Sequence, residues 1–305
     1  MTYPTGWDLD PRDGLAYRTG FGSAYQSTAE EFLETAAARR LRERVDLILT
    51  SPPFPLLSPK RYGNSEGEEY IEWLVDVFRS SLPLLTPDGS LVVEIGNSWN
   101  RGEPTMSLVP LRALMAIKEE LGLHLCQHFI CNNTARLPGP AAWVTRRRIR
   151  VKDSFTHVWW MAPTTEPKAD NRKVLKPYSD AMRRLIKTKS YNSGRRPSDH
   201  VIKDGTFLAD NGGAIPSSVL NLGNTSTQKA YSDWCKELGV RPHPARMQRA
   251  LVDFFIRFLT DEGDRVYDPF GGSNTTGNVA ESLRRRWVIS EPDSDYLMGS
   301  VGRFA

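Results

Sequence analysis

The 305-residue sequence predicts an α/β fold, in which a mostly parallel β-sheet carries helices on both faces. Short apolar segments alternate with segments of helical periodicity along most of the chain. One apolar segment stops at two successive prolines, Pro52 and Pro53, and another runs into a glycine-rich turn at Gly271 and Gly272. Both junctions are typical of parallel sheets, which bind ligands at the carboxyl ends of their strands.

The first buried strand is expected at residues 45–49, after a helix over residues 27–42. Neither proline of Pro52-Pro53 can donate a backbone hydrogen bond, so the strand has to end before them. Residues 50–54, Thr-Ser-Pro-Pro-Phe, therefore lie at a carboxyl edge of the sheet, where a rigid backbone fixes a hydroxyl, free carbonyls and an aromatic ring. The alternative is a simple strand stop with Phe54 in the core.

The next elements continue the alternation of helices and strands. Ser65 and Glu68 have the spacing of a capping box, and apolar residues follow at helical spacing as far as Phe78, before Pro83. Further along the chain we expect a turn at residues 87–89, strands at 91–95, 124–130 and 155–161, and a helix over residues 108–121 that closes at Gly122.

Histidine and cysteine side chains share one face of the strand predicted at residues 124–130. His124, Cys126 and His128 alternate there and Cys131 follows, and these residue types can bind zinc. Their spacing fits no common zinc motif and their neighbours are apolar. We therefore expect core residues here and no metal site.

The regular pattern is interrupted between residues 161 and 242. Prolines, glycines and basic pairs surround one short helix, predicted at residues 178–189, and a sharp turn at 211–213. Long irregular segments inside compact domains usually carry a function or are mobile. We interpret residues 161–242 as an insertion between two parts of one domain, residues 1–160 and 243–305.

The C-terminal segment predicts a nucleotide-type βαβ unit. A helix over residues 243–259 precedes a strand at 265–268, the glycine-rich turn, a helix over residues 275–285 and a strand at 287–290 that ends in Glu291. Glycines let the backbone approach a ligand closely, and an acidic side chain after the next strand can hold two ribose hydroxyls. Because the turn matches neither Gly-x-Gly-x-x-Gly nor a P-loop, a nucleoside is expected rather than a phosphate. A purely structural turn is the alternative.

Composition indicates a cytoplasmic globular protein. With 39% hydrophobic and 25% charged residues, the chain suits one large domain, or one domain with an insertion. It begins without a signal-peptide pattern and contains no apolar run of about 18 residues, so we expect no membrane segment. The three cysteines, Cys126, Cys131 and Cys235, build no disulfide framework and are expected to be reduced.

Positive charge is concentrated in one region. Residues 144–205 hold 16 Lys and Arg against 6 Asp and Glu, whereas the rest of the chain holds 24 against 30. A polyanion is the natural partner of such a segment, because phosphate contacts supply affinity that is independent of sequence. A solvated, charge-rich surface is the alternative. The first candidate contacts alternate over a strand-like run: Arg146, Arg147, Arg148, Arg150 and Lys152.

Two motifs together resemble a known family. Ser-Pro-Pro-Phe at residues 51–54 and Asp-Pro-Phe-Gly-Gly-Ser-Asn-Thr-Thr-Gly at residues 268–277 are similar to motifs of the DNA amino-methyltransferases, in the permuted (beta-class) order with the catalytic motif first. The resemblance covers nearly the whole chain and is strongest to cytosine-N4 modification methyltransferases. Gln26-Ser27 departs from the family, which often has Gly-Asp there, near the cofactor adenine.

The resemblance implies a Rossmann-like fold that binds S-adenosylmethionine and methylates the N4 amine of cytosine in flipped-out bases of double-stranded DNA. An exocyclic amine is a poor nucleophile. The Ser51 hydroxyl and the Pro52 carbonyl would draw its hydrogens out of the ring plane while Phe54 stacks on the base, which makes Ser51, Pro52, Pro53 and Phe54 the catalytic candidates. The residues implied for the cofactor are Asp268, Pro269, Phe270, Gly271, Gly272, Ser273, Asn274, Thr275 and Glu291.

The resemblance also implies partners. The insertion would recognise the target sequence, the basic run would clamp the DNA backbone, and a cognate restriction endonuclease would belong to the same system. A homodimer and association with the nucleoid are further expectations. Methylation at adenine N6, a non-catalytic DNA-binding module, and an RNA or protein methyltransferase stay open as alternatives. Methylation at cytosine C5 is not expected, because its cysteine nucleophile follows a proline in that family and no cysteine here does.

Overall fold

The structure is a computed structural model that describes residues 14–54, 67–189, 208–223 and 229–304, together with residues 194–195, 197 and 201–202. Ser65, the predicted helix cap, lies outside the described residues. The chain forms two compact units. One comprises Met1–Ala169 and Ser218–Ala305, and the other comprises Asp170–Ser217.

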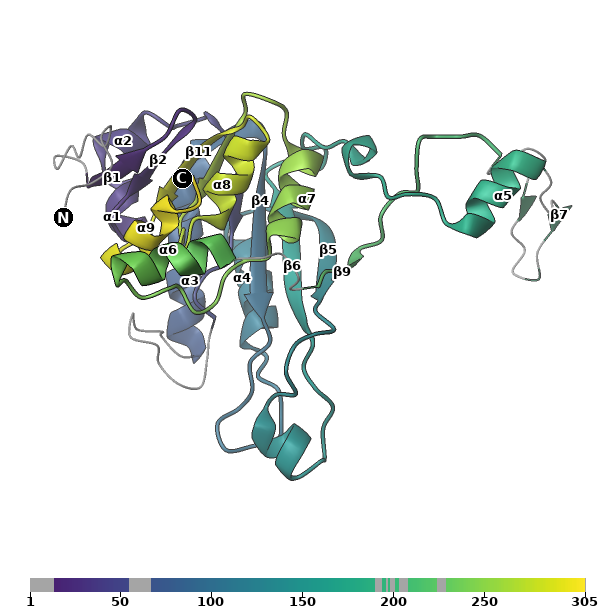
Figure 1. Ribbon diagram of the computed structural model, residues 1–305, viewed down its shortest axis with the longest axis horizontal. Coiled ribbons are helices and arrows are strands. Elements are labelled where there is room, and N and C mark those ends of the chain that lie inside the picture. Colours follow the sequence, from purple (N-terminus) through teal and green to yellow (C-terminus); the bar gives the residue numbers. More distant parts are fainter. Residues whose placement is uncertain are drawn as a thin grey trace. The chain divides into compact units, whose positions relative to one another are not determined.

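Within the described residues, the larger unit is built on one nine-stranded sheet (Figure 1). Its strands, in spatial order, are β1 (Leu15–Arg18), β2 (Gly22–Tyr25), β11 (Arg286–Ser290), β10 (Arg265–Asp268), β3 (Val45–Thr50), β4 (Leu85–Gly96), β6 (Phe155–Ala162), β5 (His124–Asn132) and β9 (Val219–Asn221). The strands from β2 to β4 in this order are parallel, whereas β6 runs antiparallel to both β4 and β5. The carboxyl ends of β3, β4, β5, β10 and β11 therefore meet at one edge of the sheet.

The central strands follow from their continuous apolar sequence. Every residue of β3 except Asp46 is buried, and β10 is buried from Val266 to Asp268. A parallel strand that is covered on both faces needs apolar residues at successive positions rather than at alternate ones. The turn predicted at residues 87–89 is part of β4, where it forms an irregularity in the pairing with β3.

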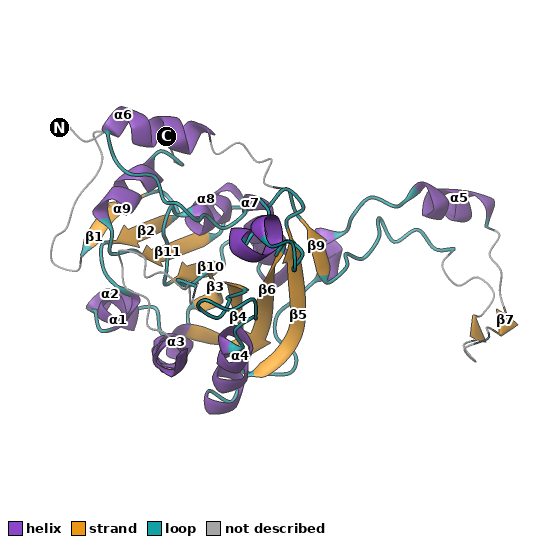
Figure 2. Ribbon diagram, turned by 90° about the horizontal axis from the view of Figure 1, so that it is seen from below, coloured by secondary structure: helices purple, strands orange, loops and turns teal. Residues whose placement is uncertain are grey.

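Helices cover both faces of the sheet (Figure 2). One face carries α1 (Ala29–Leu33), α2 (Ala36–Arg39), α3 (Gly67–Ser81) and α4 (Val109–Glu120), and the other carries α6 (Lys229–Leu238), α7 (Arg249–Leu259), α8 (Thr275–Ser282) and α9 (Ser294–Val301). In α3, Ile71, Leu74 and Phe78 lie at helical spacing and are buried against the sheet. The short 3-10 helix η2 (Leu82–Leu84) links α3 to β4. This layered arrangement confirms the predicted α/β fold.

Two helices differ most from the sequence prediction. The helix expected over residues 27–42 is divided into α1 and α2, because Thr35 has an extended backbone and its hydroxyl accepts a hydrogen bond from the Ala38 amide, which starts a second helix. The helix expected from His243 begins only at Arg249. Pro244 disfavours a helical conformation of His243, and the segment before α7 runs along a cavity instead.

The basic run at residues 146–152 is a turn and a loop, so the strand-like alternation that the sequence predicts is wrong. Ala142–Arg146 (η3) forms a π-helical turn, and the Ile149 amide donates back to the Trp143 carbonyl at 2.9 Å. Arg148 has a left-handed backbone with φ 54°, which no regular strand accommodates. The loop that carries this run joins β5 to β6, and it therefore leaves the sheet at the edge where β3 and β4 also end.

The smaller unit contains the 3-10 helix η4 (Asn171–Val174), α5 (Asp180–Thr188) and the two-residue strands β7 (Gly194–Arg195) and β8 (Val201–Ile202). β7 and β8 pair antiparallel, and the backbones of Lys176 and Ala214 exchange two hydrogen bonds of 2.8 and 2.9 Å. Ser179 caps α5 by accepting from the Met182 amide, which agrees with the helix predicted near residues 178–189. No residue of α5 is buried.

The described part of the chain contains neither a disulfide nor a helix that could span a membrane. All three cysteines are free thiols. Among the described residues, no helix combines the length and hydropathy that crossing a bilayer requires.

Candidate active site

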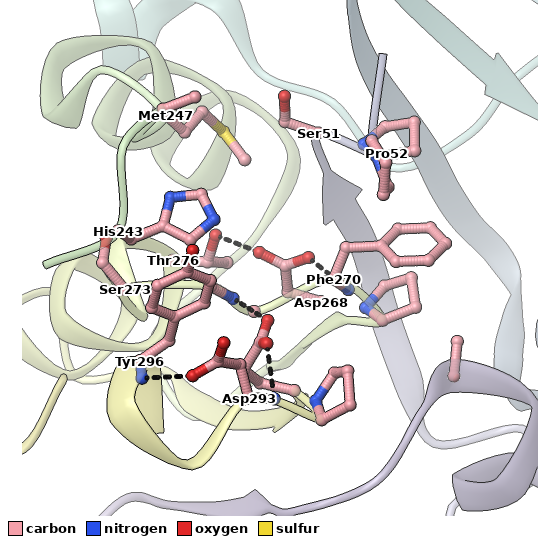
Figure 3. Close-up of a pocket in the computed structure, with 18 of the residues that line it drawn as sticks. Ser51, Pro52, His243, Met247, Asp268, Phe270, Ser273, Thr276, Asp293 and Tyr296 are labelled. Carbon is pink, nitrogen blue, oxygen red and sulfur yellow. Dashed lines mark hydrogen bonds between the residues drawn. The ribbon is translucent and has the colours of Figure 1, made fainter. Parts of the chain in front are cut away.

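One cavity opens at the carboxyl edge of β3, β10 and β11 (Figure 3). Its volume is about 280 Å³, and its walls come from both ends of the chain. Figure 3 shows Ser51 and Pro52 at one side, Asp293 and Tyr296 at the other, and Asp268 between them. The two motifs that the sequence singled out therefore meet in one place, although they lie at opposite ends of the sequence.

Most of the predicted site residues line this cavity. All of Ser51–Phe54 do so, as do eight of the nine cofactor candidates. The exception is Asn274, which is fully buried and starts α8 with a left-handed backbone. Its Oδ1 accepts from the Gly277 amide and its Nδ2 donates to the Tyr17 hydroxyl, both at 2.8 Å. Asn274 thus stabilises the turn on the side that faces away from the cavity.

Asp268 holds the floor of the cavity together. Its carboxylate accepts hydrogen bonds from the Thr50 hydroxyl at 2.6 Å, the Thr276 hydroxyl at 2.7 Å and the Phe270 amide at 3.1 Å. These donors belong to the end of β3, the start of α8 and the turn itself. Burial raises the pKa of Asp268 to about 6. The side chain is therefore a structural junction between β3 and the glycine-rich turn.

The two glycines of the turn are required by geometry. Gly272 has φ +50°, and a Cβ built on it would lie 3.2 Å from Nε2 of His243 across the cavity. A Cβ on Gly271 would lie 2.7 Å from the Ile289 side chain, closer than real Cβ atoms approach. Glycine at both positions lets the turn pack on β11 and presents bare backbone to the cavity.

Glu291 ends β11 with its carboxylate beside the turn. Its Oε2 accepts from the Gly272 amide and its Oε1 from the Asp293 amide, both at 2.9 Å. Only 8% of the residue is exposed, and burial raises the pKa of Glu291 to about 7. Each carboxylate oxygen accepts one backbone hydrogen bond and has capacity for a second. The side chain can therefore still accept two ligand hydroxyls.

Ser51 is tied to a carboxylate that the sequence analysis missed. Its hydroxyl hydrogen-bonds to Glu94 of β4, which also accepts from the Thr156 hydroxyl of β6 at 2.8 Å. Glu94 is 6% exposed, and burial raises its pKa. In the sequence, Glu94 is marked only as the single acid within the apolar strand predicted at residues 91–95. When the Ser51 hydroxyl donates to Glu94, its oxygen lone pairs remain available to accept from another group.

The Phe54 ring packs against a glycine on the neighbouring strand. A Cβ on Gly96, the last residue of β4, would lie 2.5 Å from the Phe54 ring. Gly96 thus leaves room for the ring, which is only partly buried and lines the cavity.

Further walls come from segments whose role the sequence analysis did not assign. They are Thr28–Glu30 around the start of α1, Tyr70 and Trp73 of α3, His243 and Ala245–Met247 before α7, and Asp293 and Tyr296 at the start of α9. The imidazole of His243 packs edge-on against Tyr296 with ring centroids 4.5 Å apart. Arg241 forms an ion pair at 2.5 Å with Asp293, the residue that caps the N-terminus of α9.

The cavity fits S-adenosylmethionine by the chemistry of its walls. Acceptors for a ribose lie at Glu291, and aromatic rings line one wall. Tyr70 also lines the cavity, and its buried hydroxyl has no hydrogen-bond partner among the described residues.

The predicted DNA contacts lie apart from the cavity. Arg146, Arg147, Arg148, Arg150 and Lys152 are all exposed. Arg147 stacks over the Trp143 ring at 5.2 Å, and Lys152 donates to the Thr134 carbonyl at 2.7 Å. Among the described residues, none of these five cations pairs with a carboxylate. Their charge is therefore not neutralised within the described structure.

Sequence comparison identifies relatives over nearly the whole chain. A family model described as DNA methylase matches residues 45–300. The type II methyltransferase M.PvuII of Proteus hauseri is 42% identical over 291 residues, which cover 95% of this chain and 85% of the relative. The type II methyltransferase M.BglII of Bacillus subtilis is 23% identical, covering 83% of this chain and 61% of the relative.

Solved structures agree with these matches. The PvuII DNA methyltransferase, described as cytosine-N4-specific, superimposes with a TM-score of 0.75 at 36% identity and covers 94% of this chain and 87% of that one. M1.HpyAVI in complex with SAM superimposes with a TM-score of 0.57 at 19% identity, over 93% and 98% of the two chains, which is a likeness of fold alone. The methyltransferase fold predicted from the motifs is confirmed, and the chain belongs to the DNA methylase family.

Proposed function

We propose that this DNA methylase transfers a methyl group from S-adenosylmethionine to the N4 amine of cytosine in double-stranded DNA, as the modification enzyme of a restriction-modification system. The observation that carries the proposal is the shared cavity, in which Ser51-Pro52-Pro53-Phe54 adjoins the turn at residues 268–275 and Glu291. The 42% identity to a type II methyltransferase, whose structure is described as cytosine-N4-specific, supports it.

The reaction needs acceptors around the cytosine amine. The lone pair of that amine is delocalised into the ring, so its hydrogens have to be drawn out of plane before nitrogen can attack a methyl group. In this proposal the Ser51 oxygen accepts one amine hydrogen while its own proton points to Glu94, and the Pro52 carbonyl accepts the other. Phe54 stacks on the flipped base and offsets part of the few kcal/mol that unstacking costs.

The cofactor side supplies position rather than proton transfer. S-adenosylmethionine, when bound, supplies the electrophilic methyl group. Glu291 would accept the ribose hydroxyls, and the residues from Asp268 to Thr275 would wrap the ligand, with Asn274 acting through the turn. In-line transfer depends on proximity and orientation, which a turn held by Asp268 provides.

DNA binding is assigned to two further parts of the chain. Arg146, Arg147, Arg148, Arg150 and Lys152 would contact phosphates, since they are exposed at the edge of the sheet where β3 ends. Target recognition is assigned to the insertion at residues 161–242, between catalytic parts 1–160 and 243–305. Its compact part, Asp170–Ser217, holds 10 Lys and Arg against 5 Asp and Glu.

A cognate endonuclease, a homodimer and association with the nucleoid complete the proposal. The first is supported by the type II relatives, and the other two by resemblance to the family and by DNA binding itself. Analytical ultracentrifugation tests the homodimer directly. A single species with the mass of one chain at micromolar concentration would contradict it.

Product analysis tests the proposed reaction. Duplex DNA treated with the purified protein and S-adenosylmethionine is digested to nucleosides and weighed by mass spectrometry. We expect N4-methyldeoxycytidine. N6-methyldeoxyadenosine, the product of the other chemistry in this family, would overturn the assignment to cytosine.

A further inference from the structure

We propose that Leu137 and Val151 form an apolar wedge that enters the DNA duplex and fills the space that the flipped cytosine leaves behind. This role rests on the proposed function, and it adds the residues that stabilise the opened duplex. The two side chains act by positioning, since they contact the base stack and neither the cofactor nor the reacting amine.

The two most exposed large apolar side chains among the described residues lie in one loop. Residues 133–154 join β5 to β6, and within them Leu137 is 84% exposed and Val151 is 86% exposed. Ile149 of the same loop is 41% exposed. Single exposed apolar residues are common on protein surfaces, whereas several in one short segment are typical of a surface that binds another molecule.

Hydrogen bonds hold this loop in a defined shape. The Asp153 amide donates to the Gly139 carbonyl at 3.0 Å, and Lys152 Nζ donates to the Thr134 carbonyl at 2.7 Å. These bonds join the arm that leaves β5 to the arm that enters β6. The two most exposed apolar side chains therefore stand on opposite arms of an ordered loop, and their exposure is a property of a fixed backbone.

The base of the loop is bonded to the strand end against which Phe54 packs. The Phe54 ring lies on Gly96, the last residue of β4. Asn97 follows Gly96, and its Nδ2 donates to Asp153 Oδ1 at 2.8 Å. Figure 1 shows the loop, in teal, extending beyond the ends of β5 and β6. A duplex that delivers a base to the Phe54 ring therefore passes this loop.

The charge of the loop indicates DNA as the molecule that covers its apolar side chains. Val151 stands in the sequence between Arg150 and Lys152, and none of the loop's five candidate cations pairs with a carboxylate among the described residues. Proteins that contact phosphates through such cations also insert apolar side chains between base steps. A flipped cytosine leaves a gap in the stack, and an apolar side chain in that gap offsets part of the cost of unstacking.

The test compares single-turnover methyl transfer to two duplexes that carry the methylation site of this protein, mapped by sequencing DNA that it has methylated. In one duplex the target cytosine pairs with guanine, and in the other it lies opposite an abasic site, where no pair has to be broken. Replacing Leu137 and Val151 together with Ala should slow transfer to the paired duplex by roughly ten- to a hundredfold. On the abasic duplex the variant should come within about threefold of the unmodified protein.

A second measurement follows the flipping step without turnover. The duplex carries 2-aminopurine next to the target cytosine, and S-adenosylhomocysteine replaces the methyl donor. Fluorescence should rise when the unmodified protein binds, because the neighbouring base leaves the stack, and the rise should be largely lost in the double variant. Its urea midpoint should stay unchanged, since both side chains are exposed.

The matched control replaces Met115 of α4 and Leu238 of α6 with Ala. These side chains are also apolar and exposed, and they lie on helices that cover the faces of the sheet. Their replacement removes apolar surface of similar size. It should leave transfer to both duplexes and the fluorescence change as they are in the unmodified protein.

Three outcomes would overturn the wedge. One is an undiminished rate of the double variant on the paired duplex. Another is a variant equally slow on both duplexes, because easier extrusion would then not compensate for the loss. The third is a dimeric protein that the double substitution converts to a monomer, which would assign the side chains to an interface between copies. If the unmodified protein transferred no methyl group to any base, the proposed function itself would fail, which distinguishes the two failures.

Discussion

The turn between β10 and α8 and the loop between β5 and β6, to which two different ligands are assigned in the proposal, are built in opposite ways. In the turn, Asp268 accepts three hydrogen bonds from protein donors and is buried. In the loop, Arg146 and Arg148 are exposed, and no described carboxylate pairs with them. Methyl transfer requires a fixed geometry, which buried hydrogen bonds supply, whereas a phosphate backbone is held by unneutralised charge that adapts to it. Rigidity and free charge are thus assigned to different parts of the chain.

The largest expected effect tests the rigidity of the turn. Asp268→Ala leaves the Thr50 and Thr276 hydroxyls and the Phe270 amide without their acceptor, so we expect the free energy of unfolding to fall by about 3–5 kcal/mol. Urea denaturation measures this loss. Asp268→Asn, which keeps the shape and one acceptor, should lose less. A loss below about 1 kcal/mol for the alanine variant would mean that the turn does not depend on this junction.

The next effect concerns the ligand that is proposed to bind at the turn. Glu291→Ala removes the proposed acceptor of the ribose hydroxyls and should weaken binding of S-adenosylhomocysteine by about 1.5–3 kcal/mol. Calorimetric titration gives the dissociation constant directly. Glu291→Gln keeps one acceptor and should lie between the alanine variant and the unmodified protein. An unchanged constant in the alanine variant would refute the assignment of Glu291.

The loop should respond to salt where the turn does not. Replacing Arg146, Arg147 and Arg148 together with Ala should lower affinity for all DNA sequences and reduce the slope of log affinity against log salt by up to about 3, since each phosphate contact contributes about 0.9. Affinity for S-adenosylhomocysteine should stay the same. Fluorescence anisotropy over a salt series measures both the affinity and the slope.

The matched control for the loop variant removes three arginines elsewhere. Arg39, Arg40 and Arg42 are exposed and lie just before β3, at the amino edge of the sheet. Their replacement changes the net charge equally and should leave the salt slope nearly unchanged. If the loop variant kept its slope, the phosphate contacts would have to lie within residues 168–196.

The smallest expected effect is a pH dependence that belongs to the turn alone. Burial raises the pKa of Glu291 to about 7, and the proposed ribose hydroxyls would bind its ionised form. Affinity for S-adenosylhomocysteine should therefore fall as pH is lowered from 8 to 6, by up to about tenfold. Glu291→Gln should remove most of this dependence. An equally steep dependence in that variant would assign the titration to another group.

The stability of the free protein should respond to the same group with the opposite sign. The folded pKa of Glu291 lies above the ordinary value of about 4.3, so the folded state binds the proton more tightly than the unfolded state. Its contribution to stability therefore grows as pH falls from about 7 toward 4 and is lost as pH rises through the folded pKa. Comparing urea midpoints of the unmodified protein and Glu291→Gln at several pH values isolates this term.

The sequence predicts the sheet and its motifs well because their signals are local. The apolar run of β3, its proline stop and the glycines before α8 need no knowledge of distant residues. The break at Thr35 depends on one capping hydroxyl that competes with a continuing helix. Glu30 and Trp73 come together from separate helices, so no spacing along the chain relates them. Glu94 could have been identified from the sequence, because it is a single acid inside a strand of apolar residues.

The proposed chemistry of Ser51 is tested most directly by single-turnover methyl transfer with Ser51→Ala. In the proposal, the Ser51 side chain contacts neither Glu291 nor the basic loop, so affinities for S-adenosylhomocysteine and for DNA should stay within about twofold. The rate of methyl transfer should fall by about a hundredfold or more, as when a positioned hydrogen-bonding group is removed from an active site. Isotope-labelled product from the unmodified protein should be N4-methyldeoxycytidine. An undiminished rate in Ser51→Ala, or label in N6-methyldeoxyadenosine, would contradict the account.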